Sequence, residues 1–94
     1  MTIVKDMALT PGDFLRDLGR ALPGLDYRVD GTSVEVGNAE RGLSIALREL
    51  PPRRLSGLLS LPRCEITISF RGYAAGEQEV FLERFYKAFQ RGGG

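Results

Sequence analysis

The side chains that most often carry acid–base and metal chemistry are nearly absent from this chain. Its 94 residues include no His and a single Cys, Cys64. Histidine is the commonest general acid or base near neutral pH and the commonest metal ligand, and one thiol cannot build a zinc site. The chain also lacks a glycine-rich phosphate loop with its Lys and any GxGxxG motif. We therefore predict that the protein is not an enzyme and uses no cofactor and no metal.

Cys64 itself is expected to be part of the core. It alternates with Ile66 and Ile68, so in a strand all three side chains lie on one side. A buried thiol behaves as a small hydrophobe, whereas a reactive thiolate requires an electropositive and partly exposed setting. Arg63 is adjacent in sequence but points to the opposite side of the strand, so the pattern predicts an inert thiol.

A second candidate lies in the stretch PPRRLSGLLSLPR, residues 51–63, which joins two predicted strands. It is long for a hairpin connection, and it is rich in leucine. In one interpretation the leucines cover an open edge of the core, or they extend the flanking strands into a longer hairpin. In the other, they form an apolar patch with a basic rim that contacts a protein partner or a second copy of the chain. The residues of that patch are Arg53, Arg54, Leu55, Leu58, Leu59 and Leu61.

The sequence closes on FQRGGG, three glycines after a predicted helix. In one interpretation Gly92 supplies a left-handed cap after Arg91, and Gly93 and Gly94 trail into solvent as a flexible tail. The tail also resembles that of ubiquitin-like and sulfur-carrier proteins, in which an activating enzyme adenylates the terminal glycine carboxylate. The resemblance covers Gly92–Gly94, and in that family the tail follows the last strand while a single helix crosses the sheet. It implies an alternative function, a carrier activated at its C-terminal carboxylate.

The polar sides of the predicted strands do not indicate a nucleic-acid site. They carry charges of both signs and no aromatic ring, whereas sheets that bind single-stranded RNA stack bases on exposed rings. Thirteen basic and 12 acidic residues give a net charge of +1, which implies no general attraction to nucleic acid or anionic membranes. We predict neither partner. The side chains of this face are Arg28, Glu35, Ser44, Arg48, Glu65, Thr67, Ser69 and Arg71.

Two segments with helical spacing frame the strands. In TPGDFLRDLGRALPG, Thr10 suits the N-cap, Pro11 the first helical position and Asp13 the third position after the cap. Pro23-Gly24 ends this helix, which is predicted over 11–22. A second helix is predicted over 75–91, with acidic residues early and basic residues late, as the helix dipole favours. The apolar stripes are Phe14, Leu15, Leu18, Ala21 and Leu22 in the first helix and Phe81, Leu82, Phe85, Ala88 and Phe89 in the second.

Between the helices apolar residues alternate with polar ones, the pattern of strands with one buried side. The Asp30-Gly31 pair predicts a tight hairpin turn, and residues 2–8 leave open a further strand at one edge. The apolar sides of the four main strands are Leu25, Tyr27 and Val29; Val34 and Val36; Leu43, Ile45 and Leu47; and Cys64, Ile66, Ile68 and Phe70.

Because each element has one apolar side, the sequence predicts an α+β fold in a single domain over residues 1–94. The expected architecture is a two-layer sandwich: a four-stranded, or five-stranded, antiparallel sheet with two helices on one face. One Cys allows no internal disulfide, and no signal peptide or transmembrane run is recognisable, so a cytoplasmic location is expected. The predicted function is a small non-catalytic adaptor that acts through protein–protein contacts, as a monomer or homodimer. The sequence leaves open whether an apolar pocket binds a small molecule.

Overall fold

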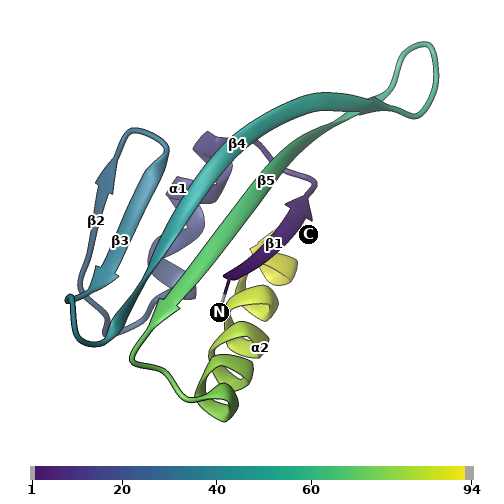
Figure 1. Ribbon diagram of the computed structural model, residues 1–94. Coiled ribbons are helices and arrows are strands. Elements are labelled where there is room, and N and C mark those ends of the chain that lie inside the picture. Colours follow the sequence, from purple (N-terminus) through teal and green to yellow (C-terminus); the bar gives the residue numbers. More distant parts are fainter. Residues whose placement is uncertain (1, 93–94) are drawn as a thin grey trace.

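The computed structural model of the protein describes residues 2–92, and the side chains of residues 2–90. The chain forms two helices and a five-stranded antiparallel sheet (Figure 1), which confirms the predicted α+β sandwich. In chain order the elements are β1 (Thr2–Met7), α1 (Pro11–Ala21), β2 (Tyr27–Asp30), β3 (Ser33–Gly37), β4 (Gly42–Arg54), β5 (Ser60–Arg71) and α2 (Ala75–Gly92).

The strands lie in the order β1-β5-β4-β3-β2, and every neighbouring pair is antiparallel. The weakly patterned N-terminal residues form the fifth strand, β1, which pairs with β5 at one edge of the sheet. The predicted hairpin between β2 and β3 is present, with Asp30 opposite Ser33. Gly31 has a φ of 60°, a conformation that glycine adopts without the steric cost other residues meet.

Helix α1 begins as its sequence predicts. The backbone N–H of Asp13 donates to Oγ1 of Thr10 at 3.0 Å, and the Asp13 carboxylate accepts from the Thr10 N–H at 3.4 Å. This reciprocal capping box satisfies two donors that a helix start leaves unpaired. The helix ends at Ala21, where the N–H of Leu22 still bonds to the carbonyl of Leu18.

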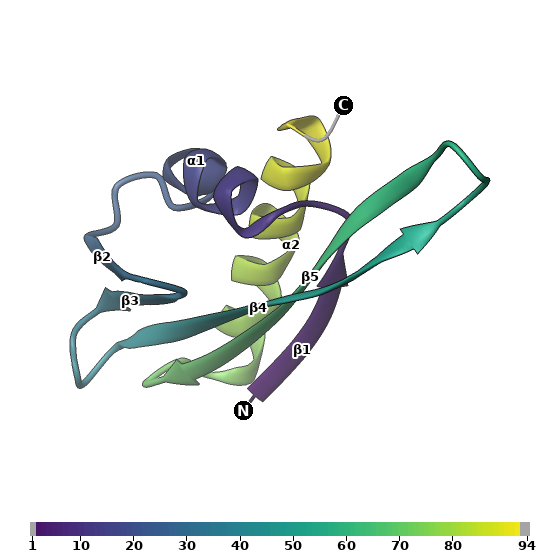
Figure 2. The same cartoon turned by 90° about the horizontal axis from the view of Figure 1, so that it is seen from above.

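Both helices pack on the same face of the sheet (Figure 2). Rings from the two helices meet there: Phe14 of α1 stacks on Phe89 of α2 at 4.7 Å between centroids and lies 6.0 Å from Phe85. The alternating residues of β3, β4 and β5 complete the core beneath them. The buried apolar residues are Phe14, Leu18, Ala21, Leu22, Val34, Val36, Leu43, Ile45, Leu47, Cys64, Ile66, Ile68, Phe70, Phe85 and Phe89.

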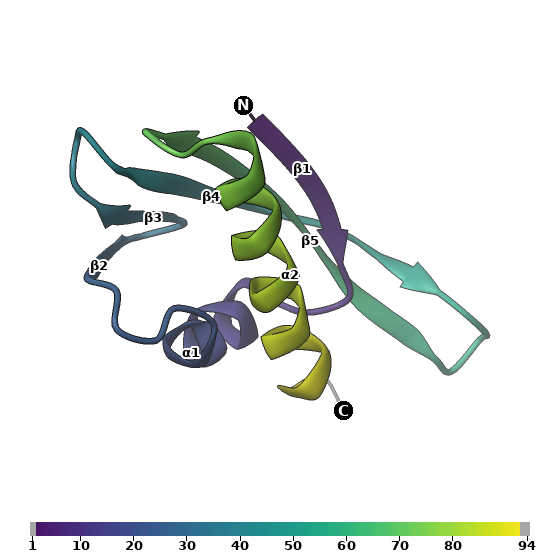
Figure 3. The same ribbon diagram turned by 90° about the horizontal axis from the view of Figure 1, so that it is seen from below.

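The structure corrects the prediction that the first strand of the hairpin has a buried side. Leu25, Tyr27 and Val29 are all exposed. The buried strand residues belong to β3, β4 and β5 only, and β2 lies beyond them at the edge of the sheet (Figure 3). Helix α1 comes near Tyr27, whose hydroxyl would lie 3.4 Å from a Cβ at Gly19, but the cover over β2 is incomplete. The alternating pattern of this edge strand therefore does not lead to burial.

Candidate functional site

The longest two strands of the sheet extend well beyond their neighbours. Pairing of β4 with β3 ends at Ala46, and pairing of β5 with β1 begins only at Cys64. From there residues 48–63 continue as a two-stranded ribbon, here called the arm, that projects away from the helices (Figures 1 and 2). The arm makes the molecule elongated, with extents of 48 × 24 × 22 Å.

The arm decides between the two structural interpretations of the leucines in residues 51–63. Every residue from 51 to 61 is exposed. Leu58, at the tip, is fully exposed, and Leu59 and Leu55 are 59% and 53% exposed. The leucines therefore do not cover the core; they belong to an extension of the flanking strands into a longer hairpin.

The register of the arm collects its leucines on one side. Arg53 lies opposite Leu61, and the Leu55 N–H donates to the Leu59 carbonyl at 2.9 Å. Residues that face each other across antiparallel strands share a side, and residues two apart along a strand do as well. Leu55, Leu59 and Leu61 therefore share one side of the arm with Arg53. The pair Arg54 and Ser60 lies on the opposite side.

Few backbone N–H groups of the arm are available to bind an added strand, both along its edges and at its tip. Pro51, Pro52 and Pro62 have no N–H, so strand addition along the arm lacks donors at these positions. At the tip the Ser56 hydroxyl accepts from the N–H groups of Leu58 and Leu59 at 3.3 and 3.2 Å. Contact through the arm is consequently favoured through side chains rather than through an added strand.

Ion pairs hold the base of the arm to the sheet. Arg63 donates to the Asp6 carboxylate of β1 at 2.6 Å, a bond that raises the pKa of this guanidinium. Arg48 pairs with Glu65 at 3.1 Å. Among the described residues, the guanidinium groups of Arg53 and Arg54 make no ion pair and no hydrogen bond. The outer part of the arm thus presents two free positive charges, Arg53 on the side of the leucines and Arg54 on the opposite side.

The structure brings all six predicted contact residues together on this arm. They occupy the end of β4, the turn and the start of β5, within one projecting ribbon. They are Arg53, Arg54, Leu55, Leu58, Leu59 and Leu61.

The polar face of the sheet is occupied by cross-strand pairs. The Ser44 hydroxyl donates to Glu35 at 2.7 Å and accepts from Arg71 at 2.7 Å, and Arg71 also pairs with Glu35 at 3.3 Å. These side chains from β3, β4 and β5 satisfy one another, as charges of opposite sign do on a solvated sheet face.

Cys64 lies in the core, as predicted. Its side chain is fully buried at the point where β5 leaves the body of the sheet. Burial raises the pKa of this thiol, because the interior disfavours the thiolate. The nucleophilic form is therefore suppressed at neutral pH.

The glycine tail is described only in part. Helix α2 runs through Gly92, one residue beyond the predicted end, so this glycine belongs to the helix rather than following it as a cap. Helix ends vary by a residue or two with small differences in the last turn. Gly93 and Gly94, on which the carrier interpretation rests, lie outside the described residues.

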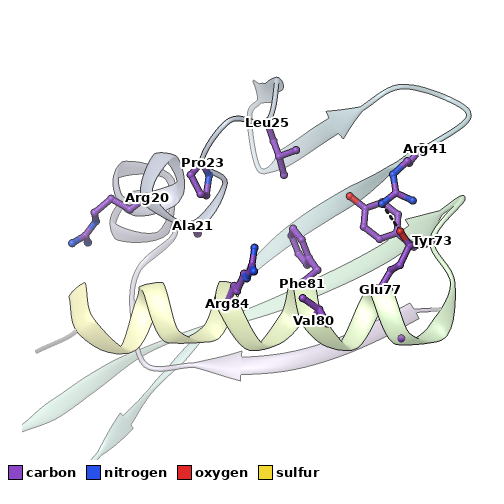
Figure 4. A pocket seen from close by; sticks show the side chains of 11 residues that line it. Arg20, Ala21, Pro23, Leu25, Arg41, Tyr73, Glu77, Val80, Phe81 and Arg84 are labelled. Carbon is purple, nitrogen blue, oxygen red and sulfur yellow. Dashed lines mark hydrogen bonds and ion pairs between the residues drawn. The ribbon is translucent and has the colours of Figure 1, made fainter.

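The structure also contains a pocket whose position the sequence did not indicate. A pocket of about 520 Å³ opens between the end of α1, the first half of α2 and the segments before β2 and β4 (Figure 4). Its lining comes from separate stretches of chain, and Val80 lies outside the predicted apolar stripe of the second helix, so no single local pattern marks the pocket. The lining residues are Arg20, Ala21, Pro23, Leu25, Arg41, Tyr73, Gly76, Glu77, Val80, Phe81 and Arg84.

Within residues 2–92 no group of three or more Asp, Glu, Cys or His side chains is placed to hold a metal ion. In the same part of the chain, neither helix has the length and apolar character needed to cross a bilayer. Comparison with known proteins finds no matching family model, no matching curated protein and no matching solved structure.

Proposed function

We propose that the protein is a small non-catalytic binding module that contacts another protein surface through its arm. The observation that carries the proposal is the projecting ribbon itself, with leucines gathered on one side, the free Arg53 beside them and the free Arg54 on the opposite side. A two-stranded hairpin without a covering layer is marginally stable in water. An exposed arm of this kind gains order and buried area when a second surface covers it.

The energetics are consistent with a specific but moderate contact. Burying a leucine side chain fully contributes about 1.5–3 kcal/mol, so the four arm leucines offer at most about 6–12 kcal/mol. Association costs on the order of 4–15 kcal/mol in lost freedom. The leucines alone therefore leave little surplus, and Arg53 and Arg54 are expected to add charge-assisted contacts to acidic groups on the partner surface. Arginine is one of the residues enriched in such contact surfaces.

Two kinds of surface fit this description: a second copy of the chain, or a different protein with an apolar strip and acidic groups at its edge. A cytoplasmic adaptor, as monomer or homodimer, is the corresponding role in the cell. The two cases are distinguished by whether purified protein associates alone.

The test is the double substitution Leu58→Asp with Leu59→Asp. Both side chains are exposed, so the variant should fold normally by circular dichroism, while its association is lost. Sedimentation velocity measures self-association, and affinity purification from the native host, analysed by mass spectrometry, compares partners of the two forms.

Val4→Asp is the matched control, since Val4 is 60% exposed on a strand away from the arm. It should keep both self-association and partners. Unchanged sedimentation together with an unchanged partner set in the double variant would contradict the proposal.

A further inference from the structure

We propose that the pocket between α1 and α2 binds a small carboxylic acid with an apolar body. This site is separate from the arm, and the inference does not depend on the proposed protein contact. The volume of about 520 Å³ lies within the range of small-molecule sites, about 300–1,000 Å³.

The walls of the pocket are apolar and open to solvent. Val80 is 54% exposed and Leu25 is 40% exposed, and Phe81 lies between them at the floor (Figure 4). Pro23 and Ala21 complete this wall from the end of α1. Exposed apolar side chains around a hollow favour a ligand whose body is apolar.

At one end of the pocket the charged side chains are already paired with each other. Arg41 donates to Glu77 at 2.7 Å and to the carbonyl of Gly72 at 3.0 Å, and its guanidinium lies over the Tyr73 ring at 4.1 Å from the centroid. Glu77 also accepts from the N–H of Ala74 at 3.0 Å. The hydrogen bond from Arg41 lowers the pKa of Glu77. Glu77 therefore fills the anion position at the start of α2, where a phosphate would otherwise be expected to bind.

The other end carries a positive charge without a partner. Among the described residues, Arg84 makes no ion pair and no hydrogen bond, although it lines the pocket one turn after Val80. Arg20, across the pocket on α1, is paired with Asp17 at 3.0 Å. A single free guanidinium matches a single carboxylate, which it can bind through two parallel hydrogen bonds. The apolar wall and the free charge together specify an amphipathic monoanion.

The charge of the pocket also argues against the arm of a second copy as its occupant. Three arginines and one glutamate line it, and the outer arm carries Arg53 and Arg54. Insertion of the arm of a second copy would bring like charges together, which opposes that occupant.

The test uses octanoate as the probe, with octan-1-ol and octylammonium as neutral and cationic analogues of the same chain length. Amide chemical shifts of the ¹⁵N-labelled full chain are followed during each titration. Octanoate should give saturable shifts confined to residues around the pocket, Leu25, Val80 and Phe81 among them. The alcohol should bind at least about tenfold more weakly, since a hydrogen bond to a charged group contributes about 1.5–3 kcal/mol, and the ammonium should not bind.

Two variants assign the charge. Arg84→Gln should weaken octanoate binding by about tenfold or more, whereas Lys87→Gln, one turn further along α2 and outside the pocket, should leave it within about twofold. Val80→Glu places an acid on the apolar wall and should abolish binding. All three positions are exposed, so the folded spectrum should persist.

Equal binding of octanol and octanoate, equal effects of the Arg84 and Lys87 variants, or shifts that do not saturate or lie outside the pocket would overturn the proposal.

Discussion

Truncation of Phe85 tests how the two helices are packed on the sheet. Its ring is fully buried and lies 5.0 Å from Phe89, 5.5 Å from Phe81 and 6.0 Å from Phe14 between ring centroids. Phe85→Ala removes this ring from the centre of the aromatic cluster and leaves a cavity that rigid neighbours cannot fill completely. Such substitutions cost about 3–5 kcal/mol. That is a large part of the total stability of a small domain, about 5–15 kcal/mol.

The assay is urea unfolding followed by circular dichroism, with the free energy of unfolding extrapolated to water. Leu58→Ala is the matched control, because the same kind of truncation at a fully exposed side chain should change stability by less than about 0.5 kcal/mol. A loss below about 1 kcal/mol for Phe85→Ala would refute the packing described above. So would a loss of similar size in the control.

Three further outcomes are expected. Replacement of residues 51–62 by a short Asn-Gly turn should change the free energy of unfolding by less than about 1 kcal/mol, because this part of the arm contributes nothing to the core; global unfolding of the shortened chain would show otherwise. Cys64 should react with a thiol reagent only after unfolding, given its burial and raised pKa; rapid labelling of the native protein would contradict this. Glu77 should titrate below the ordinary range of a Glu, so its stabilising contribution is present at neutral pH and is lost as pH falls through the lowered pKa. Arg41→Gln should return that pKa toward its usual value in a ¹³C NMR titration, and an unchanged pKa would show that Arg41 is not the cause.

The fold could be predicted where local signals and burial agree. The capping residues Thr10 and Asp13 define the start of α1, and the alternation of Cys64, Ile66 and Ile68 marks the interior strand β5. Each of these patterns determines the structure of a single helix or strand, and each helix or strand has one apolar side to bury. The sandwich follows from combining such sides, which is why layers and strand direction were predictable.

The arm was only partly predictable. Its six residues were singled out from composition as candidate contacts. The extension of its strands was only one of the interpretations left open, because Pro51 and Pro52 interrupt the pattern of a strand. The irregular pairing between Leu50 and Arg53 also shifts the alternation by the residues that the bulge inserts. The strands continue because β4 and β5 pair with each other beyond the ends of β1 and β3.

The exposure of β2 and the pocket depend on how elements are placed relative to one another. Val29 has the alternating pattern of a buried residue, yet it lies on the edge strand β2 and remains 47% exposed. The pocket combines Leu25, Arg41 and Arg84 from three separate parts of the chain. Such placements follow from packing across the whole domain, and no stretch of sequence encodes them locally.

The most direct test of the arm as a contact surface is site-specific photo-crosslinking in the native host. A photoreactive phenylalanine analogue is introduced at Leu58, or at Leu61 in a second variant, with Glu79 on the exposed side of α2 as the control position. We expect irradiation to give a discrete covalent adduct from both arm positions, either a dimer of this chain or a complex with one other protein, and none from the control. The absence of an adduct from both arm positions, or the same adduct from all three, would contradict the proposed function.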